Sequence, residues 1–399
     1  MRIHIQMIAA AVLSAALAAS AQEAVRPDVG KPLQAAQELI KAGKYKDALA
    51  KVRDADAVPS KSANETYMIE RMRIAAASGA GDVETAAKSF EVVAPKVSAA
   101  DKLRMIESIT GAYYRAAQYA KAQQWGQRYF KEGGTSGAIR TLLIQSQYLS
   151  GDFAGAAKEL TTEIKQAEAG GATPAEDRLK LLVNATLKMN DTNGYVWALE
   201  RLVTYYPKRD YWVDLLSRLQ RKPNFSDRLA LDTYRLSLAT GSMTQANDFM
   251  EMAQLAVQAG SPNEAKQVLD KGFAANILGV GPQADRQKRL RELVVKRLEE
   301  DKAGQAAAIE EAKAAKDGTA LANIGLNQVF AGDKKGLELM QQGIAKDNLK
   351  RADDVKLHYA IAQINAGEAA KAQATLRTVA GTDGTADLAR LWALYAKRK

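Results

Sequence analysis

The chain has 399 residues, no cysteine and a formal net charge of +10. Without cysteine it can form neither a disulfide nor a lipid-modified cysteine, so packing alone must stabilise it. Its length exceeds what one hydrophobic core usually serves. Its few aromatic residues (6%) and nine prolines favour a mostly helical chain of several domains or repeats. The basic balance attracts acidic partners, but no RNA-binding signature with interleaved aromatics occurs, so we expect no nucleic acid partner.

Residues 1–21 have the layout of a secretory signal peptide. Arg2 precedes an apolar run over residues 8–19, and Ala19, Ser20 and Ala21 form a small-residue cleavage site. The run is shorter than the about 20 apolar residues that a membrane span needs. We therefore expect cleavage after Ala21, a periplasmic or secreted protein without an integral membrane segment, and an N-terminal tail over residues 22–30.

A repeated pattern begins at residue 31. A small residue at a turn is followed by small and bulky residues five, nine and twelve positions later, as Gly43 is by Ala48, Val52 and Ala55. The turn residues of five copies are Gly43, Gly81, Ala117, Gly151 and Asn190, which are 38, 36, 34 and 39 residues apart. Turns at Gly332 and Gly367, 35 residues apart, repeat the pattern near the C-terminus. This period is typical of helix-turn-helix solenoid units.

Each position of the pattern has a physical reason. Glycine tolerates the left-handed backbone that ends a helix, and the following aspartate can cap the next helix. Such aspartates are Asp82, Asp152, Asp191 and Asp333. Alanine lets two helices approach closely, and the bulky residues fall on one helix face, where they fill the space between units.

These residues resemble the tetratricopeptide repeat (TPR): Gly43-Lys44-Tyr45 and Gly151-Asp152-Phe153, then alanine, a bulky residue and a closing proline such as Pro95. The resemblance covers residues 31–207 and 319–380, although the first helices lack the family's tryptophan and Leu-Gly pair. It implies an all-α fold, a right-handed α-solenoid of antiparallel helix pairs in a TPR-like superhelix. It further implies a scaffold or adaptor for protein–protein interaction, which together with the signal-peptide pattern indicates an exported bacterial protein.

Between residues 208 and 318 the pattern is less regular. Gly241 and Gly260 both fit but lie only 19 residues apart, so one of them marks a turn between repeats. Residues 276–284 contain Gly279, Gly281 and Pro282 and read as a connector. We therefore predict a solenoid with an N-terminal part over residues 31–275 and a C-terminal part over residues 285–399.

First helices of successive repeats line the concave face of a solenoid, where ligands bind. The side chains expected there form a basic, hydrogen-bonding groove that suits an acidic peptide or a terminal carboxylate. They are Arg71, Arg104, Tyr114, Arg115, Gln145, Tyr148, Lys180, Asn184 and Lys188. Lys180 and Asn184 resemble one half of the family's carboxylate clamp. The alternative, a solvated basic helix face, stays open at this point.

Catalysis has little support in the sequence. Beyond the signal peptide the only histidine is His358. A single histidine on a helix cannot supply the several ligands that a metal needs. We therefore expect the protein to be no enzyme and to bind no metal or cofactor. Two alternatives remain. The charge would suit an envelope factor that binds anionic glycan or lipid headgroups. Glu107-Ser108 and Leu339-Met340-Gln341 resemble pieces of a lytic transglycosylase motif, but more than two hundred residues separate them.

Overall fold

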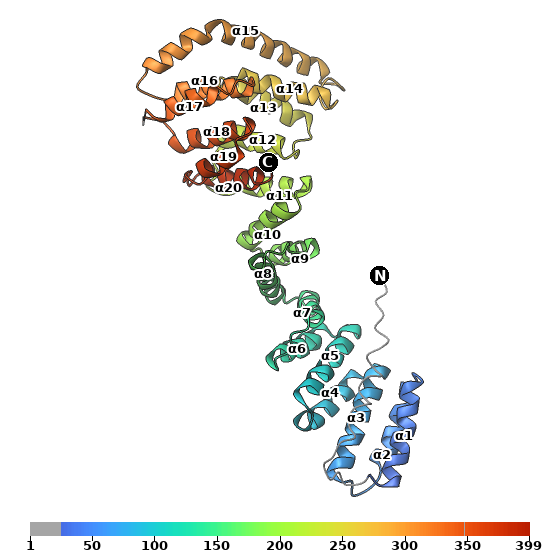
Figure 1. The fold of residues 1–399 in the computed structure, drawn as a ribbon. Helices are drawn as coiled ribbons and strands as arrows, with labels where there is room; N and C mark the ends of the chain where they lie inside the picture. The colour runs from blue at the N-terminus through green and yellow to red at the C-terminus, as the bar shows by residue number, and fades with distance from the viewer. Residues whose placement is uncertain (1–24, 347) are drawn as a thin grey trace. The chain divides into compact units, whose positions relative to one another are not determined.

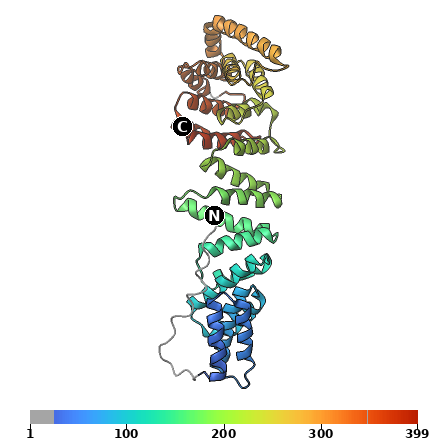
Figure 2. The same cartoon turned by 90° about the vertical axis from the view of Figure 1, so that its right-hand side faces the viewer.

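The computed structural model describes residues 25–346 and 348–399, and within them every regular element is a helix (Figure 1, Figure 2). The predicted signal peptide and cleavage site lie outside the described residues. The chain divides into two compact units. The first comprises the described residues up to Gln166 together with residues 188–190, and the second comprises residues 167–187 and 191–399.

The first unit is a row of antiparallel helix pairs. Its helices are α1 (Pro27–Lys41), α2 (Tyr45–Asp56), α3 (Ala63–Ala80), α4 (Val83–Val93), the short η1 (Ala94–Lys96), α5 (Ala99–Arg115), α6 (Tyr119–Lys131), α7 (Gly137–Leu149) and α8 (Phe153–Ala169), which ends beyond its boundary. Helices α1, α3 and α5 each pack on their own second helix, and α1, α3, α5 and α7 also pack on one another in that order. This is the predicted all-α solenoid architecture.

The predicted turns are confirmed by the backbone. All predicted turn residues have a positive φ, from +54° at Ala117 to +90° at Gly332. The full set is Gly43, Gly81, Ala117, Gly151, Asn190, Gly241, Gly260, Gly332 and Gly367. The cap residues behave as expected at three sites: Asp82, Asp152 and Asp191 each accept a hydrogen bond from the backbone N–H three residues on. Asp333 instead accepts from Lys335 N, inside the turn.

The small and bulky positions form the core that the pattern predicts. The alanines five residues after the turns, Ala48, Ala86, Ala122 and Ala156, are fully buried. Val52 and Phe90, nine residues after their turns, are buried in the clusters that hold α1–α3 and α3–α7 together. Because a larger side chain at the alanine positions would separate the paired helices, the alanines fix the helix spacing.

The predicted tail over residues 22–30 is wrong for its second half. Helix α1 already begins at Pro27, whose missing N–H and fixed φ suit the first helical position. Asp28 follows in the first turn, where a negative charge favours the helix dipole. Val29 is fully buried, so the first turn of α1 belongs to the core.

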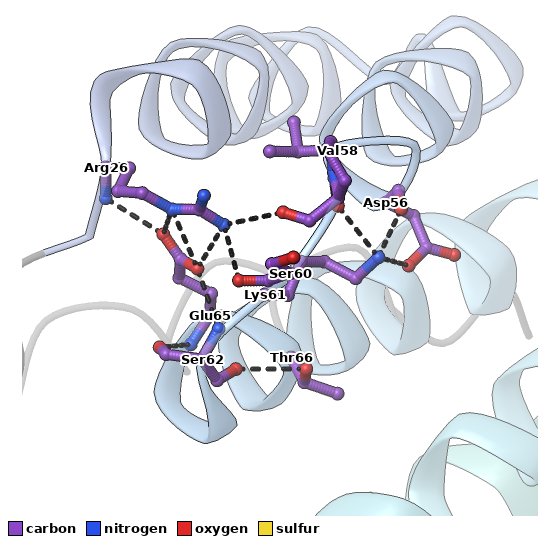
Figure 3. Close-up of polar contacts among 9 residues, drawn as sticks. Arg26, Asp56, Val58, Ser60, Lys61, Ser62, Glu65 and Thr66 are labelled. Carbon is purple, nitrogen blue, oxygen red and sulfur yellow. Dashed lines mark hydrogen bonds and ion pairs between the residues drawn. The ribbon is translucent and has the colours of Figure 1, made fainter.

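The start of α1 is fastened to the start of α3 by Arg26 and Glu65 (Figure 3). The backbone N–H and the Nε of Arg26 donate to Glu65 Oε1 at 3.0 and 2.9 Å, and Nη2 donates to Oε2 at 2.9 Å. Glu65 also closes a capping box with Ser62, and it is only 2% exposed. The hydrogen bond from Arg26, and then the one from Ser62 N, lower the pKa of Glu65 to about 2.

We expect the stability of helices α1–α3 to depend on pH through Glu65. Because its folded-state pKa lies below the ordinary 4.5, its stabilising effect is complete above pH 4.5 and is lost as pH falls toward 2. The protection of α1 and α3 amides against hydrogen exchange, relative to the intrinsic exchange rate at each pH, should therefore fall over this range. Glu65→Gln should be less protected at neutral pH and approach the parent at pH 2.5. Glu38→Gln, at an exposed carboxylate of α1, should follow the parent throughout.

The second unit contains the remaining helices. They are α9 (Glu176–Lys188, whose last residue falls in the first unit), α10 (Thr192–Tyr205), α11 (Arg209–Gln220), the short η2 (Asp227–Leu229), α12 (Ala230–Ala239), α13 (Ala246–Gln258), α14 (Pro262–Ala274), α15 (Ala284–Ala314), α16 (Thr319–Phe330), α17 (Gly336–Ile344), α18 (Ala352–Asn365), α19 (Ala369–Leu376) and α20 (Thr385–Ala396). The pairs are α13 with α14, α16 with α17 and α18 with α19. The turn at Gly260 joins α13 to α14 within one pair. The turn at Gly241 lies between α12 and α13, outside that pair, as the 19-residue spacing requires.

The last helices of the second unit return to its first ones (Figure 1). Helix α20 packs on α10, α12 and α18, while α16 packs on α14 and α18. Two ion pairs link α20 to residues nearer the start of this unit. Lys222 Nζ lies 2.8 Å from Asp387 Oδ2, and Arg390 Nε lies 2.8 Å from Glu200 Oε1. The helices of this unit therefore close on themselves.

The predicted division at residues 276–284 does not coincide with the division between units. These residues do form the loop between α14 and α15, with positive φ at Asn276, Gly279 and Gly281. However, Leu278 within the loop is 1% exposed and packs in one cluster with Leu269 of α14 and with apolar residues of α15. The loop belongs to a continuous core, and the boundary lies near residue 166 instead.

Candidate functional site

All nine residues of the predicted partner surface lie on the first helices of pairs, namely α3, α5, α7 and α9. None of the nine is buried, and Arg104, Arg115, Lys180, Asn184 and Lys188 are exposed. Each of these helices ends just before one of the predicted turns, and the binding of a partner along them stays a prediction. Because Lys180 and Asn184 belong to the second unit and the other seven to the first, their convergence on one groove stays a prediction.

Arg71 of α3 and Arg104 of α5 lie near the same carboxylate. Arg104 Nη2 is 2.7 Å from Asp101 Oδ1. A hydrogen bond from Ser98 Oγ, followed by the charges of Arg104 and Arg71, lowers the pKa of Asp101 against the effect of burial. The guanidinium of Arg71 also lies 5.6 Å from the centre of the Tyr67 ring. These two predicted residues thus come together on neighbouring first helices.

The two tyrosines among the predicted residues each contact an aromatic neighbour. Tyr114 meets Tyr119 edge to face at 5.6 Å, and Tyr148 meets Phe153 in the same way at 5.3 Å. Burial, and then Tyr119, raise the pKa of Tyr114. Arg115 folds back along α5, since a Cβ at Gly111 would lie 3.3 Å from its Nη1. The surface is thus aromatic as well as basic.

The second unit holds a cavity of about 370 Å³ that the sequence analysis missed. Its walls come from η2 and α12, α13, the start of α14, α16 and α18. The cavity lies where the returning helix α18 meets α12. It therefore exists only because the helices of this unit close on themselves.

An ionic cluster of Asp232, Arg235, Glu264 and His358 lies beside this cavity. Arg235 donates from Nε and Nη2 to the two oxygens of Glu264 and from Nη1 to Asp232, each at 2.7 Å. The side chains of Arg235, Asp232 and Glu264 are 4%, 5% and 2% exposed. His358 Nε2 lies 2.9 Å from Asp232 Oδ1. His358 thus has a specific partner within the cluster.

The charges within the cluster outweigh the cost of burying them. Burial on its own would raise the pKa of Asp232, but the charges of His358 and Arg235 hold it well below the ordinary value. Burial would lower the pKa of Arg235, but Glu264 and then Asp232 raise it above its usual range. Both groups therefore stay charged at neutral pH.

Part of this cluster has a visible sequence signal. Asp232 and Arg235 stand one helical turn apart in the leucine-rich segment 229–238, which suggests an ion pair that helix α12 buries. Glu264 and His358 are 29 and 126 residues from their partners. No local pattern could have assigned them to the same site.

No protein-family model matches the chain, and no curated protein matches it. Among solved structures, the crystal structure of yeast Tom70 is similar over 93% of this chain and 96% of that chain, with 11% identity and a TM-score of 0.25. A structure of Naa15/Naa10 bound to HypK-THB is similar over 88% of this chain and 58% of that chain, under two thirds, with 14% identity and a TM-score of 0.29. These low scores carry no functional argument.

The assignment of the fold therefore rests on the helix pairs, the left-handed turns and the repeat period of the chain itself. The fold is a tetratricopeptide-like α-solenoid. Within its described residues no helix is both long and apolar enough to cross a membrane. In the same part of the solenoid, no three carboxylates or histidines gather as metal ligands. Glu107 and the segment 339–341 belong to different units.

Proposed function

We propose that this solenoid is a non-catalytic scaffold of the TPR family that binds a protein or acidic peptide partner along the first helices of its first unit. We place it in the periplasm or outside the cell, on the signal-peptide pattern of residues 1–21. The observation that carries the proposal is the layer formed by α1, α3, α5 and α7.

The first helices lie closer to one another than the second helices do. The first helices pack on one another directly. The second helices α4 and α6 are linked through long charged side chains, Lys121 to Glu84 and Arg128 to Glu91. Because the inner side of a curved row is the more crowded, the first helices form the concave side, which is where solenoids bind partners.

The chemistry of the layer suits an acidic partner. The Arg104 side chain is 60% exposed, and Arg115 is exposed as well. Their guanidinium groups can form paired hydrogen bonds with carboxylates. Tyr114 and Tyr148 on the same layer of first helices add rigid contact area. A peptide that carries Asp or Glu beside apolar residues fits these groups.

The experiment is a crosslinking pull-down of the chain from its own cell envelope, followed by binding measurements with the partner identified. We expect Arg104→Glu with Arg115→Glu to weaken binding about tenfold or more, because both substitutions reverse charges that face the partner. Lys46→Glu with Lys88→Glu makes the same charge change on the second helices α2 and α4 and should leave binding unchanged. Equal binding by both variants contradicts the proposal.

A salt titration separates this proposal from binding to an anionic glycan or lipid headgroup. Binding to a charged polymer depends on many screened charges and should collapse at high ionic strength. A peptide held by apolar anchors as well should remain partly bound. The purified exported chain should also begin at Gln22, which N-terminal sequencing reads directly.

A further inference from the structure

The cavity of the second unit combines an apolar wall with charged groups. Leu231, Leu255 and Leu326 supply the apolar part. Leu231 is 8% exposed and Leu326 is 4% exposed. A volume of about 370 Å³ lies within the range of about 300–1,000 Å³ that small-molecule sites occupy. The cavity therefore has the size and composition of a small-ligand site.

Most charges on the cavity wall are already neutralised by neighbours. Arg228 pairs with Asp354 at 3.0 Å and with Asp383, and Arg235 is enclosed by the ionic cluster. Burial raises the pKa of Asp354, although the charge of Arg228 opposes this. These groups shape the wall but have little capacity left for a ligand.

Two opposite charges remain available. Across residues 25–346 and 348–399, neither the guanidinium of Arg351 nor the carboxylate of Asp227 has an ion pair or side-chain hydrogen bond. Both side chains line the cavity, and both residues are exposed. Arg351 comes from the start of α18 and Asp227 from η2, on the two sides that meet when the unit closes. One free cation and one free anion thus line a single cavity.

A buried hydroxyl on the wall also lacks a partner. Ser261 is 3% exposed, and its Oγ has no hydrogen-bond partner, although it precedes α14 at a position where serine usually caps. The amides of Gln258 and Asn323 add further donors and acceptors to the cavity.

We propose that this cavity binds a small zwitterion of the α-amino-acid class with an apolar side chain. Arg351 holds the carboxylate, Asp227 holds the ammonium group, and the side chain lies against the three leucines. Such a ligand bridges η2 and α18. Binding therefore also strengthens the contact through which the second unit closes. This site is independent of the partner surface proposed for the first unit.

The test is calorimetric titration of the full chain with L-leucine, accompanied by thermal unfolding. We expect saturable binding and a rise in the unfolding temperature of the second unit. N-acetyl-L-leucine lacks the ammonium group and L-leucinamide lacks the carboxylate, so each should bind about tenfold or more weakly. N-acetyl-L-leucinamide, which imitates an internal peptide residue, should bind least. Equal binding of this neutral compound overturns the proposal, as does the absence of binding by L-leucine, L-methionine and L-phenylalanine.

Two substitutions assign the charges. Arg351→Gln should weaken leucine and N-acetyl-leucine but leave leucinamide unchanged, and Asp227→Asn should show the opposite selectivity. Both positions are exposed, so both variants should fold. Arg377→Gln and Asp285→Asn make the same changes at exposed positions outside the cavity and should bind leucine like the parent. Variants of Arg351 and Asp227 that bind all four compounds as the parent does overturn the proposal.

Discussion

Replacing Arg235 by methionine should destabilise the second unit by about 3–5 kcal/mol, the usual cost of removing one partner from a buried ion pair. The guanidinium is 4% exposed and donates three hydrogen bonds of 2.7 Å to Glu264 and Asp232. Without it, two carboxylates remain whose side chains are only 5% and 2% exposed. Asp232 keeps His358 beside it, and Glu264 loses its partner. Staying charged in this site or taking up a proton both favour the unfolded state.

Denaturant unfolding and hydrogen exchange of α12 and α14 measure this loss. The double variant Arg235→Met with Glu264→Met should be less destabilised than Arg235→Met, because it removes a stranded charge along with its partner. Arg218→Met provides the exposed control: its ion pair with Asp214 is about one-third exposed on each side, and its loss should cost about 1 kcal/mol or less. A loss of the same size at Arg235 would show that the ionic cluster is not held as tightly as its distances indicate.

The local features of the fold were predictable because they depend on residues close together in the chain. A glycine or asparagine that ends a helix, an aspartate that caps the next one and an alanine five residues on are all decided within one turn and one helix. The positive φ of Gly43, Gly81 and Asn190 and the full burial of Ala48 follow from that local logic. The placement of the predicted surface residues on first helices follows from it too.

The closure of the second unit was not predictable in the same way. It depends on Lys222 meeting Asp387 and on His358 meeting Asp232, pairs that lie 165 and 126 residues apart. Charged residues on helices are common, and their sequence gives no sign of which of them meet. The cavity was not predictable for the same reason, because its two free charges come from η2 and α18, which are far apart in the chain. A solenoid pattern predicts neighbours along the row, whereas this site lies between helices far apart in that row.

Adding a single methyl group should reduce the stability of the protein most where α16 packs on α17. Gly318 and Gly325 lie seven residues apart on the α16 side, and Gly336 and Gly343 are spaced in the same way on α17. They meet in pairs: a Cβ at Gly325 would lie 2.4 Å from the carbonyl oxygen of Gly336, and one at Gly318 would lie 1.8 Å from that of Gly343. The obstacle in both cases is backbone, which cannot rotate aside as a side chain does.

Gly325→Ala should therefore force the two helices apart and destabilise the second unit by about 3 kcal/mol, at the upper end of overpacking effects, despite the better helix propensity of alanine. Thermal unfolding and the exchange of α16 amides measure the change. Gly304→Ala in α15 is the matched control, because nothing lies within 4 Å of a Cβ there. That variant should gain about 0.4–1 kcal/mol from the reduced freedom of its unfolded chain. The two substitutions are chemically identical, so opposite signs would establish that contact between backbones sets the spacing of this pair, and a gain at both positions would refute it.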